Sequence, residues 1–325
     1  MTPEYRRDTV VCLLMATAIV TGVISYRTGE EMPKPPPQAA APSRTLAKFV
    51  PPPAPAGAGM VLRDEMRKAL DEEGDAPLQK RLDLLAGITG EPNPPECRAL
   101  LDALLKPCPA NAPEGWHAEY LHNIAGLLQS SAGMREPFAR ALGTLARDSK
   151  RDATVRDYAL QHLRLVWERA DGTLRTEVEG TLRALATDPA LQSSALLSLH
   201  LLGGAGGLGE VAPSSKSIGG KGRVADADLV PFVDSILAES PSPGNITARL
   251  TALRIAGERR LSGCRESLRR VAAGESEHTL TRMAAIANLG LIADPADRTF
   301  LESINGNGDG RIANAVRKAL AATAP

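Results

Sequence analysis

The sequence predicts an all-α protein built from stacked helical hairpins, and its composition gives two indications of this. Aromatic residues make up only 3% of the 325 residues, whereas leucine and alanine are abundant. This composition favours thin layers of packed helices over a β-sandwich or barrel, which would need more Val, Ile, Thr and Tyr. The 29 glycines and 25 prolines gather in two segments and at regular breaks, so they separate helices from one another.

The charge balance and the cysteines argue against several classes of protein. Lys plus Arg and Asp plus Glu both total 38, so no global field attracts nucleic acid or anionic lipid. No pair among Cys12, Cys97, Cys108 and Cys264 has the C-x-x-C spacing of a zinc site. The sequence does not decide whether Cys97 and Cys108 form a disulfide, although a helix between them would hold the two cysteines roughly 15 Å apart. We expect no metal, no cofactor and no nucleic acid.

A run of uncharged residues from Thr9 to Tyr26 follows a short N-terminal tail, residues 1–8. At about 1.5 Å per residue, a helix of this length spans roughly 27 Å, enough for one crossing of a bilayer core. Arg6 and Arg7 precede the run, which favours a cytoplasmic N-terminus and a periplasmic or otherwise extracytoplasmic helical domain. A cleaved signal peptide is the alternative, but no A-x-A pattern follows the run closely. We expect an uncleaved, single-pass membrane anchor at residues 9–26.

Proline dominates the next segment, residues 27–59, which contains MPKPPPQAAAPSRTLAKFVPPPAPAGAG. Because proline fixes φ and removes backbone donors, we expect an extended spacer rather than core. At about 3.1 Å per residue it could reach up to roughly 80 Å from a membrane. The alternative, a ligand for a proline-binding module, is supported by composition alone.

Helical periodicity begins after this segment. In residues 60–131 apolar residues recur at intervals of three and four, which predicts three short helices and then a longer one from Glu114 to about Ser130. The breaks between the short helices lie at residues 74–77 and 91–95. We expect these helices to form hairpins. One stripe of the longer helix consists of Trp116, Tyr120, Ile124, Leu127 and Leu128.

One helical pattern recurs five times in residues 132–325. The segments TVRDYALQHL, ALQSSALLSL, TARLTALRIA, LTRMAAIANL and RIANAVRKAL start 36, 57, 33 and 31 residues apart. Apart from the longest step, this period is typical of two-helix repeats. Each segment has an apolar or small residue at a first position and again four and eight residues later, which defines one face of a helix. These residues are Val155, Ala159 and Leu163; Leu191, Ala195 and Leu199; Ala248, Ala252 and Ala256; Thr281, Ala285 and Leu289; and Ile312, Val316 and Leu320.

An arginine follows the first position in three of the five segments, as Arg156, Arg249 and Arg282. The pattern V-R-x-x-A followed by A-L resembles the inner helix of HEAT repeats, which belong to the armadillo-like helical proteins. The resemblance covers roughly Met134 to Ala324 and is closest in TVRDYALQHL and LTRMAAIANL. It implies a right-handed α–α superhelix, a solenoid of hairpins in which each repeat touches only its neighbours.

The resemblance to HEAT repeats implies scaffolding more often than chemistry. We therefore expect a membrane-anchored scaffold at the cell envelope that mediates protein–protein interaction and is not an enzyme. No residue identifies the partner or the oligomeric state. The alternative is an enzyme or a lyase-like regulatory subunit built on the same array. The sequence offers no G-x-S-x-G or S-x-x-K pattern for a nucleophile.

The stretch INGNGDGRIANAV, Ile304–Val316, resembles part of an EF-hand calcium loop. Asn305, Asn307 and Asp309 occupy loop positions 1, 3 and 5. Position 12, which requires a Glu that binds with both oxygens, is instead Val316, a packing position of the last repeat. Asn and Gly also suit a turn before a helix. We expect no calcium binding here.

The longest step between repeats contains a glycine-rich insertion, residues 203–228. Its GGKG is not a phosphate-binding loop, because Lys221 is followed by Gly222 rather than by Ser or Thr. We expect an insertion at one edge of the array. The alternative is a partner-binding lid that becomes ordered on contact.

Two groups of polar residues are candidate sites. His117, Glu119 and His122 are the dense group of metal-ligating residue types, but a metal would need further ligands from other helices. We expect His117 to be a half-buried core residue. The stretch GERRLSGCRESLRR is the candidate for binding an anionic partner, since arginine is enriched at interfaces; the alternative is a solvated outer helix. Its arginines are Arg259, Arg260, Arg265, Arg269 and Arg270.

Overall fold

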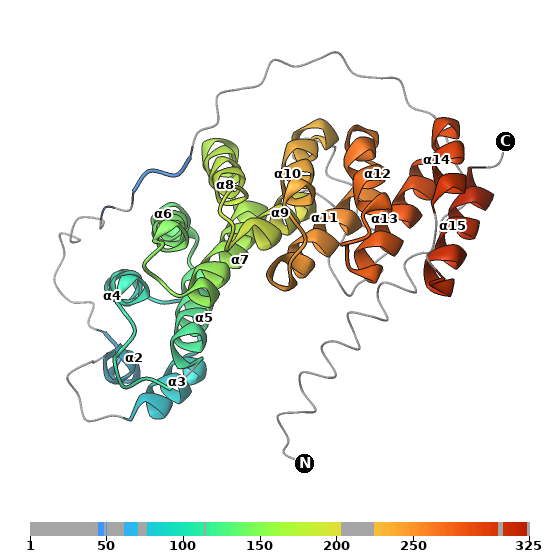
Figure 1. Cartoon of the computed structure of the whole chain (residues 1–325). Helices are drawn as coiled ribbons and strands as arrows, with labels where there is room; N and C mark the ends of the chain where they lie inside the picture. Colours follow the sequence, from blue (N-terminus) through green and yellow to red (C-terminus); the bar gives the residue numbers. More distant parts are fainter. Residues whose placement is uncertain are drawn as a thin grey trace. The chain divides into compact units, whose positions relative to one another are not determined.

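The computed structural model describes residues 45–48, 50, 62–70, 77–113, 115–202, 224–304 and 308–323. In these residues it contains fourteen α-helices, four short 3-10 helices and no β-strand (Figure 1), which confirms the all-α prediction. The α-helices are α2 Asp64–Leu70, α3 Leu78–Gly87, α4 Pro94–Leu105, α5 Trp116–Gln129, α6 Arg135–Arg147, α7 Ala153–Arg169, α8 Gly172–Leu185, α9 Gln192–Leu201, α10 Asp226–Ala238, α11 Ile246–Glu258, α12 Arg265–Ala273, α13 Thr279–Ile292, α14 Arg298–Ser303 and α15 Gly310–Ala322. The 3-10 helices are η1 Ala132–Met134, η2 Pro243–Asn245, η3 Ser262–Cys264 and η4 Pro295–Asp297.

The helices pack in two rows that alternate along the chain. Each even-numbered helix contacts the odd-numbered helix that follows it, so the chain forms consecutive hairpins from α2–α3 to α14–α15. Each odd-numbered helix from α3 to α13 also contacts the next odd-numbered one. In the other row α2 contacts α4, α4 contacts α6, α6 contacts α8 and α10 contacts α12. This packing fits a helical-repeat fold.

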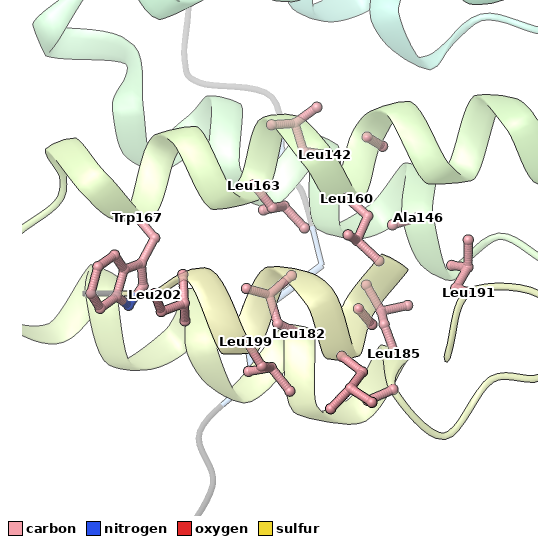
Figure 2. Packing of buried hydrophobic residues seen from close by; sticks show 14 of the residues in the cluster. Leu142, Ala146, Leu160, Leu163, Trp167, Leu182, Leu185, Leu191, Leu199 and Leu202 are labelled. Carbon is pink, nitrogen blue, oxygen red and sulfur yellow. The ribbon is translucent and has the colours of Figure 1, made fainter. Parts of the chain in front are cut away.

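A buried apolar cluster extends through the hairpins. Figure 2 shows the part between α6 and α9, where Leu142 of α6, Leu160 and Leu163 of α7, and Leu182 of α8 are buried together. The predicted repeat register is confirmed in α7, α9, α11 and α13, since all three positions of the pattern are buried in each. In α15, Ile312 is buried while Val316 and Leu320 are half-buried.

Local sequence determines where several of these helices begin. Asp152, His278 and Asp309 are N-caps of α7, α13 and α15, and each side chain accepts a hydrogen bond from a backbone N–H of the first turn. The helix predicted to start at Glu114 begins instead at Trp116. The reason is Gly115, whose φ of 79° lies outside the helical range.

A buried arginine joins the two helices of four hairpins. Arg156 donates from Nε to the carbonyl of Ala146 at 2.9 Å, and Arg282 donates from Nε to the carbonyl of Ala272 at 3.2 Å. Both acceptors are the second-to-last residue of the preceding helix, where carbonyls lack partners within the helix. The side chain therefore caps the C-terminus of the helix against which its own helix packs.

The other two hairpins have an arginine contact to the same carbonyl position, although Arg249 donates from a different guanidinium nitrogen. Arg249 donates from Nη1 to the carbonyl of Leu237 at 3.2 Å, and Arg81 donates from Nε to the carbonyl of Ala69 at 3.0 Å. All four arginines are the fourth residue of their helix. The sequence pattern missed Arg81 because the polar Lys80 stands at the first position of its repeat.

The same side chains reach the next hairpin. Arg156 forms an ion pair with Asp188, and Arg249 forms one with Glu277. In α9 the corresponding residue is Gln192, whose Nε2 donates to Glu239 Oε1 at 3.1 Å. Each of these contacts thus links a helix to the hairpin after it.

The structure leaves several predicted segments outside the described residues. These are the anchor at 9–26, most of the linker at 27–59, the insertion up to residue 223, and Asn305 and Asn307. Within the described ranges, none of the helices combines the length and apolar character required to cross a membrane. The unit that holds the helices extends from Ser43 to Pro325, so it includes part of the predicted linker.

Replacing Arg249 with Leu should lower the free energy of unfolding by about 3–5 kcal/mol, because the change leaves the buried Glu277 carboxylate and the α10 carbonyls without their donor. Arg254→Leu in the same helix is the matched control, since Arg254 is 40% exposed and lies 3.8 Å from Glu258. Its cost should be below about 1 kcal/mol. Urea unfolding followed by circular dichroism measures both, and equal losses would contradict the capping role.

Candidate functional site

The five candidate arginines lie at the end of α11 and along α12, but three of them bind other parts of the chain. Arg259 is buried, with 8% of its surface exposed. Its Nη1 donates to Asp226 Oδ1 at 2.9 Å and to the Val224 carbonyl at 3.3 Å, and its Nη2 donates to the His200 carbonyl at 2.8 Å. His200 and Val224 stand on either side of residues 203–223. Arg259 therefore holds the two ends of the insertion together.

This contact also fixes the tautomer of His200. Arg259 Nε donates to His200 Nδ1 at 3.1 Å, so the ring carries its proton on Nε2. His200 Nε2 lies 2.8 Å from Glu258 Oε2, and this hydrogen bond lowers the pKa of the Glu258 carboxyl group. This cluster joins the two ends of the insertion, and its described side chains are not arranged for catalysis.

Arg265 and Arg269 converge on Asp297 of η4, whose side chain is fully buried. The Nε atoms of the two arginines lie 2.9 Å and 2.6 Å from its carboxylate oxygens. The hydrogen bond to Asp297 raises the pKa of Arg265. Arg269 also lies over the Phe300 ring, 5.5 Å from its centroid. These contacts attach α12 to the following hairpin.

Arg260 and Arg270 are the exposed members of the group. Arg260 lies two residues after α11 and has a positive φ of 49°, and Arg270 donates from Nη2 to Ser267 Oγ at 3.2 Å. The five arginines therefore do not form one free surface. Partner binding through this stretch stays a prediction, and it now depends on these two residues.

The structure does not bring His117, Glu119 and His122 together. His117 is buried, and burial lowers its pKa, whereas Glu119 and His122 are exposed. His122 Nδ1 instead lies 3.3 Å from His162 Nε2 of α7. Across the parts of the chain that the structure describes, no three His, Cys, Asp or Glu side chains gather as metal ligands. The expectation of no metal stays a prediction.

His162 is held neutral by its surroundings. Gln129 Nε2 lies 2.6 Å from His162 Nδ1, so the amide donates to that nitrogen and leaves the ring proton on Nε2, facing His122. Burial, and secondarily His122, lowers the pKa of His162 to about 4. The adjacent cavity of about 10 Å³ is lined mainly by apolar residues, and such a volume holds at most about one water. We find no ligand site at this pair.

The pKa of His162 predicts a loss of stability in acid. The unfolded chain takes up this proton near the ordinary pKa of 6.5, but the folded chain only near pH 4. The free energy of unfolding should therefore fall as pH drops through that window, by at most about 1.4 kcal/mol per pH unit from this group. His162→Gln should reduce this slope in urea unfolding measured at a series of pH values. His278→Asn, which keeps an N-cap at an exposed site, is the control; an unchanged slope in His162→Gln would contradict the assignment.

The described cysteines and the described part of the C-terminal turn bear on two further expectations. Cys97 is buried and Cys108 is exposed. Both are free cysteines, so the structure contains no disulfide between them. Asp309 caps α15 by accepting from Arg311 N at 2.9 Å, and its carboxylate also pairs with the Arg311 side chain at 2.9 Å. The absence of calcium binding stays a prediction, because Asn305 and Asn307 lie outside the described residues.

An apolar face that the sequence reasoning missed lies on α13. Leu280 is 50% exposed and Leu291 40% exposed, and Ala287 between them is exposed as well. The spacing of these residues, together with the half-buried Ala284, places them along one side of the helix. We call Leu280, Ala284, Ala287 and Leu291 the α13 strip. The signal was present, because LTRMAAIANLGL has apolar residues outside the repeat positions as well as at them.

The neighbouring helices carry polar residues at most of the same repeat positions; the exception is Ala322 of α15. Where α13 has Leu280, Ala287 and Leu291, α11 has Thr247, Arg254 and Glu258, all exposed. In α15 the residues that correspond to Leu280 and Ala287 are Arg311 and Lys318, also exposed. Since α13 contacts both α11 and α15, the strip is an apolar centre with a charged border, the pattern of protein interfaces.

Comparisons with known proteins give little further information. No protein-family model matches the sequence, and no curated protein matches it. Among solved structures, the chain is similar to human deoxyhypusine hydroxylase in complex with glycerol, with 18% identity and a TM-score of 0.31. The match covers 80% of this chain and 94% of that one.

This comparison contradicts one expectation. The prediction that the chain is not an enzyme is wrong as it stands, because the similar structure is that of an enzyme, a hydroxylase. At this TM-score, no activity, substrate or site residue carries over to the present chain.

Proposed function

We propose that the hairpins form a HEAT-like solenoid and that it binds a protein partner through the α13 strip. The observation that carries this proposal is the exposure of Leu280 and Leu291 at positions where α11 has polar residues; at the Leu280 position α15 has a polar residue too, Arg311. Surface leucines that are scattered singly need no explanation, but a row along one helix with a charged border favours an interface.

The recurring arginine supports the solenoid. In an array of repeats, each unit must present the same contact to its neighbours. Arg156 and Arg249 cap the preceding helix and pair with an acid of the next hairpin. Such a contact can recur only if successive hairpins are related by a similar displacement.

The border of the strip indicates the chemistry of the partner. The border is mainly basic: exposed Arg311 and Lys318 lie on α15, and exposed Arg254 lies on α11 beside the exposed Glu258. A partner segment with apolar side chains and acidic flanking residues complements this arrangement, and the charges mainly accelerate association and fix its orientation. In the alternative function, an enzyme or a lyase-like regulatory subunit, the strip is the surface that contacts the associated subunit.

The variant Leu280→Glu/Leu291→Glu should lose partner binding by roughly tenfold or more, because it places two carboxylates in the centre of the interface. Crosslinking and affinity capture of the full-length protein from membranes compare the proteins retained by wild type and variant. Ala273→Glu, at an exposed position of the other row in α12, is the control for added charge. Equal capture by both variants and wild type would exclude the strip.

We also propose that residues 9–26 anchor the array in a membrane, with the helical domain outside the cytoplasm. An alkaline phosphatase fused after Pro325 should be active, because this reporter requires an extracytoplasmic location, whereas a fluorescent protein that folds only in the cytosol should be dark. A second pair of fusions in which Arg6 and Arg7 are replaced by Glu tests the charge rule. Cytosolic reporter activity in the wild type would overturn the orientation.

A further inference from the structure

A short part of the proline-rich segment packs against the helices. Leu46 is 3% exposed, whereas its neighbours Thr45, Ala47 and Lys48 are exposed. The Leu46 N–H donates to Thr181 Oγ1 of α8 at 2.9 Å, and the Leu46 carbonyl accepts from Arg147 Nη2 of α6 at 3.0 Å. Because α6 and α8 contact each other, this segment lies across two consecutive hairpins. The spacer predicted for residues 27–59 is thus interrupted by one docked residue.

The surface below Leu46 is shaped to receive it. Gly143 of α6 is buried, and a Cβ at this position would lie 3.2 Å from Leu46 Cδ1, closer than an ordinary contact. The absence of a side chain at Gly143 therefore provides the space for the leucine. Gly143, Arg147 and Thr181 together define what we call the Leu46 groove.

The polar groups of the groove face a peptide backbone. Thr181 is fully buried, and its hydroxyl donates to the Glu177 carbonyl at 2.9 Å, which leaves the oxygen free to accept from Leu46. Burial lowers the pKa of Arg147, so this side chain is partly desolvated where it donates to the Leu46 carbonyl. One donor and one acceptor are thus aimed at the two backbone groups of a single residue.

We propose that the Leu46 groove is a docking site for an extended peptide with one leucine, and that residues 45–48 of this chain occupy it in cis as an autoinhibitory strap. The backbone hydrogen bonds are available from any extended segment, and only the leucine side chain provides selectivity. A short tether supplies the strap at an effective concentration on the order of millimolar. A peptide from a partner binds only by displacing it. The groove lies in the row opposite to the α13 strip, so this proposal stands independently of the proposed function.

Disulfide trapping tests whether residues 45–48 of the same chain occupy the Leu46 groove. A Cβ at Gly143 would lie 3.6 Å from Leu46 Cβ, within the range of about 3.5–4.5 Å for disulfides. In the full-length chain with Cys12→Ser and Cys108→Ser, the pair Leu46→Cys/Gly143→Cys should form a disulfide within one chain on mild oxidation. The pair Leu46→Cys/Gly126→Cys is the control, because Gly126 is a helical glycine of α5 with open surroundings. Absence of a bond would overturn the strap, and a disulfide-linked dimer would replace it with the segment of a second copy.

Peptide competition tests the docking site. The probe is a fluorescent peptide with the sequence of residues 43–50, SRTLAKFV, and its binding to the full-length protein is measured by polarisation. Leu46→Asp should release the strap, so the peptide should bind this variant at least tenfold more tightly than it binds wild type. Equal binding to both proteins, or binding to neither, would overturn the proposal.

A second substitution, made in the Leu46→Asp protein, tests whether the peptide binds in the Leu46 groove or at another surface. Thr181→Val removes the acceptor and should weaken peptide binding severalfold. Thr176→Val is its matched control, because Thr176 makes the same kind of bond to a carbonyl four residues earlier in α8 and is exposed. Thermal melts verify that both variants are folded. Equal binding by the two variants would show that the peptide docks elsewhere and would overturn the assignment.

Discussion

The packing of this protein depends on a buried arginine at the start of the second helix of a hairpin. Every α-helix ends with carbonyls that have no partner within the helix, and in a stack of hairpins these ends are covered by the next helix. Arg81, Arg156, Arg249 and Arg282 supply donors at this place from the fourth residue of their helices. A guanidinium has five N–H donors, so it can cap one helix and still bind an acid of the next hairpin.

The buried charge also fixes the register of the repeats. A desolvated arginine is costly unless its donors are paired, so a hairpin that shifted along its neighbour would leave the cation without carbonyls or carboxylate. Arg81 shows that the second partner can change, because it reaches Tyr120 Oη at 3.4 Å and lies over the Trp116 ring. In α9 the position is the neutral Gln192. This change from Arg to Gln occurs in the helix that precedes the insertion. Arg259 binds the residues on both sides of that insertion, His200 and Val224.

The two proposed surfaces lie in different rows of helices. The Leu46 groove is formed by α6 and α8, and the α13 strip belongs to the row of odd-numbered helices. Both arise from departures from the repeat pattern. Gly143 lacks a side chain on a helix where one would fill the groove, and the exposed positions of α13 are apolar where the neighbouring helices have mostly polar or charged residues. In a fold whose repeats are fixed by recurring contacts, such departures are where specific binding can develop.

The sequence by itself determined most of the helices, the repeat register and the positions of three of the four buried arginines, because these follow from spacings within one helix and its flanking turns; the capping role of the arginines came from the structure. Only the tertiary structure decided the roles of Arg259, which binds His200 59 residues away, and of Leu46, which binds Thr181 135 residues away. A single leucine among prolines has no periodicity, and a cluster of arginines has the same composition whether it faces solvent or carboxylates. Those outcomes depend on which side chains the folded chain brings together, and no local pattern encodes that.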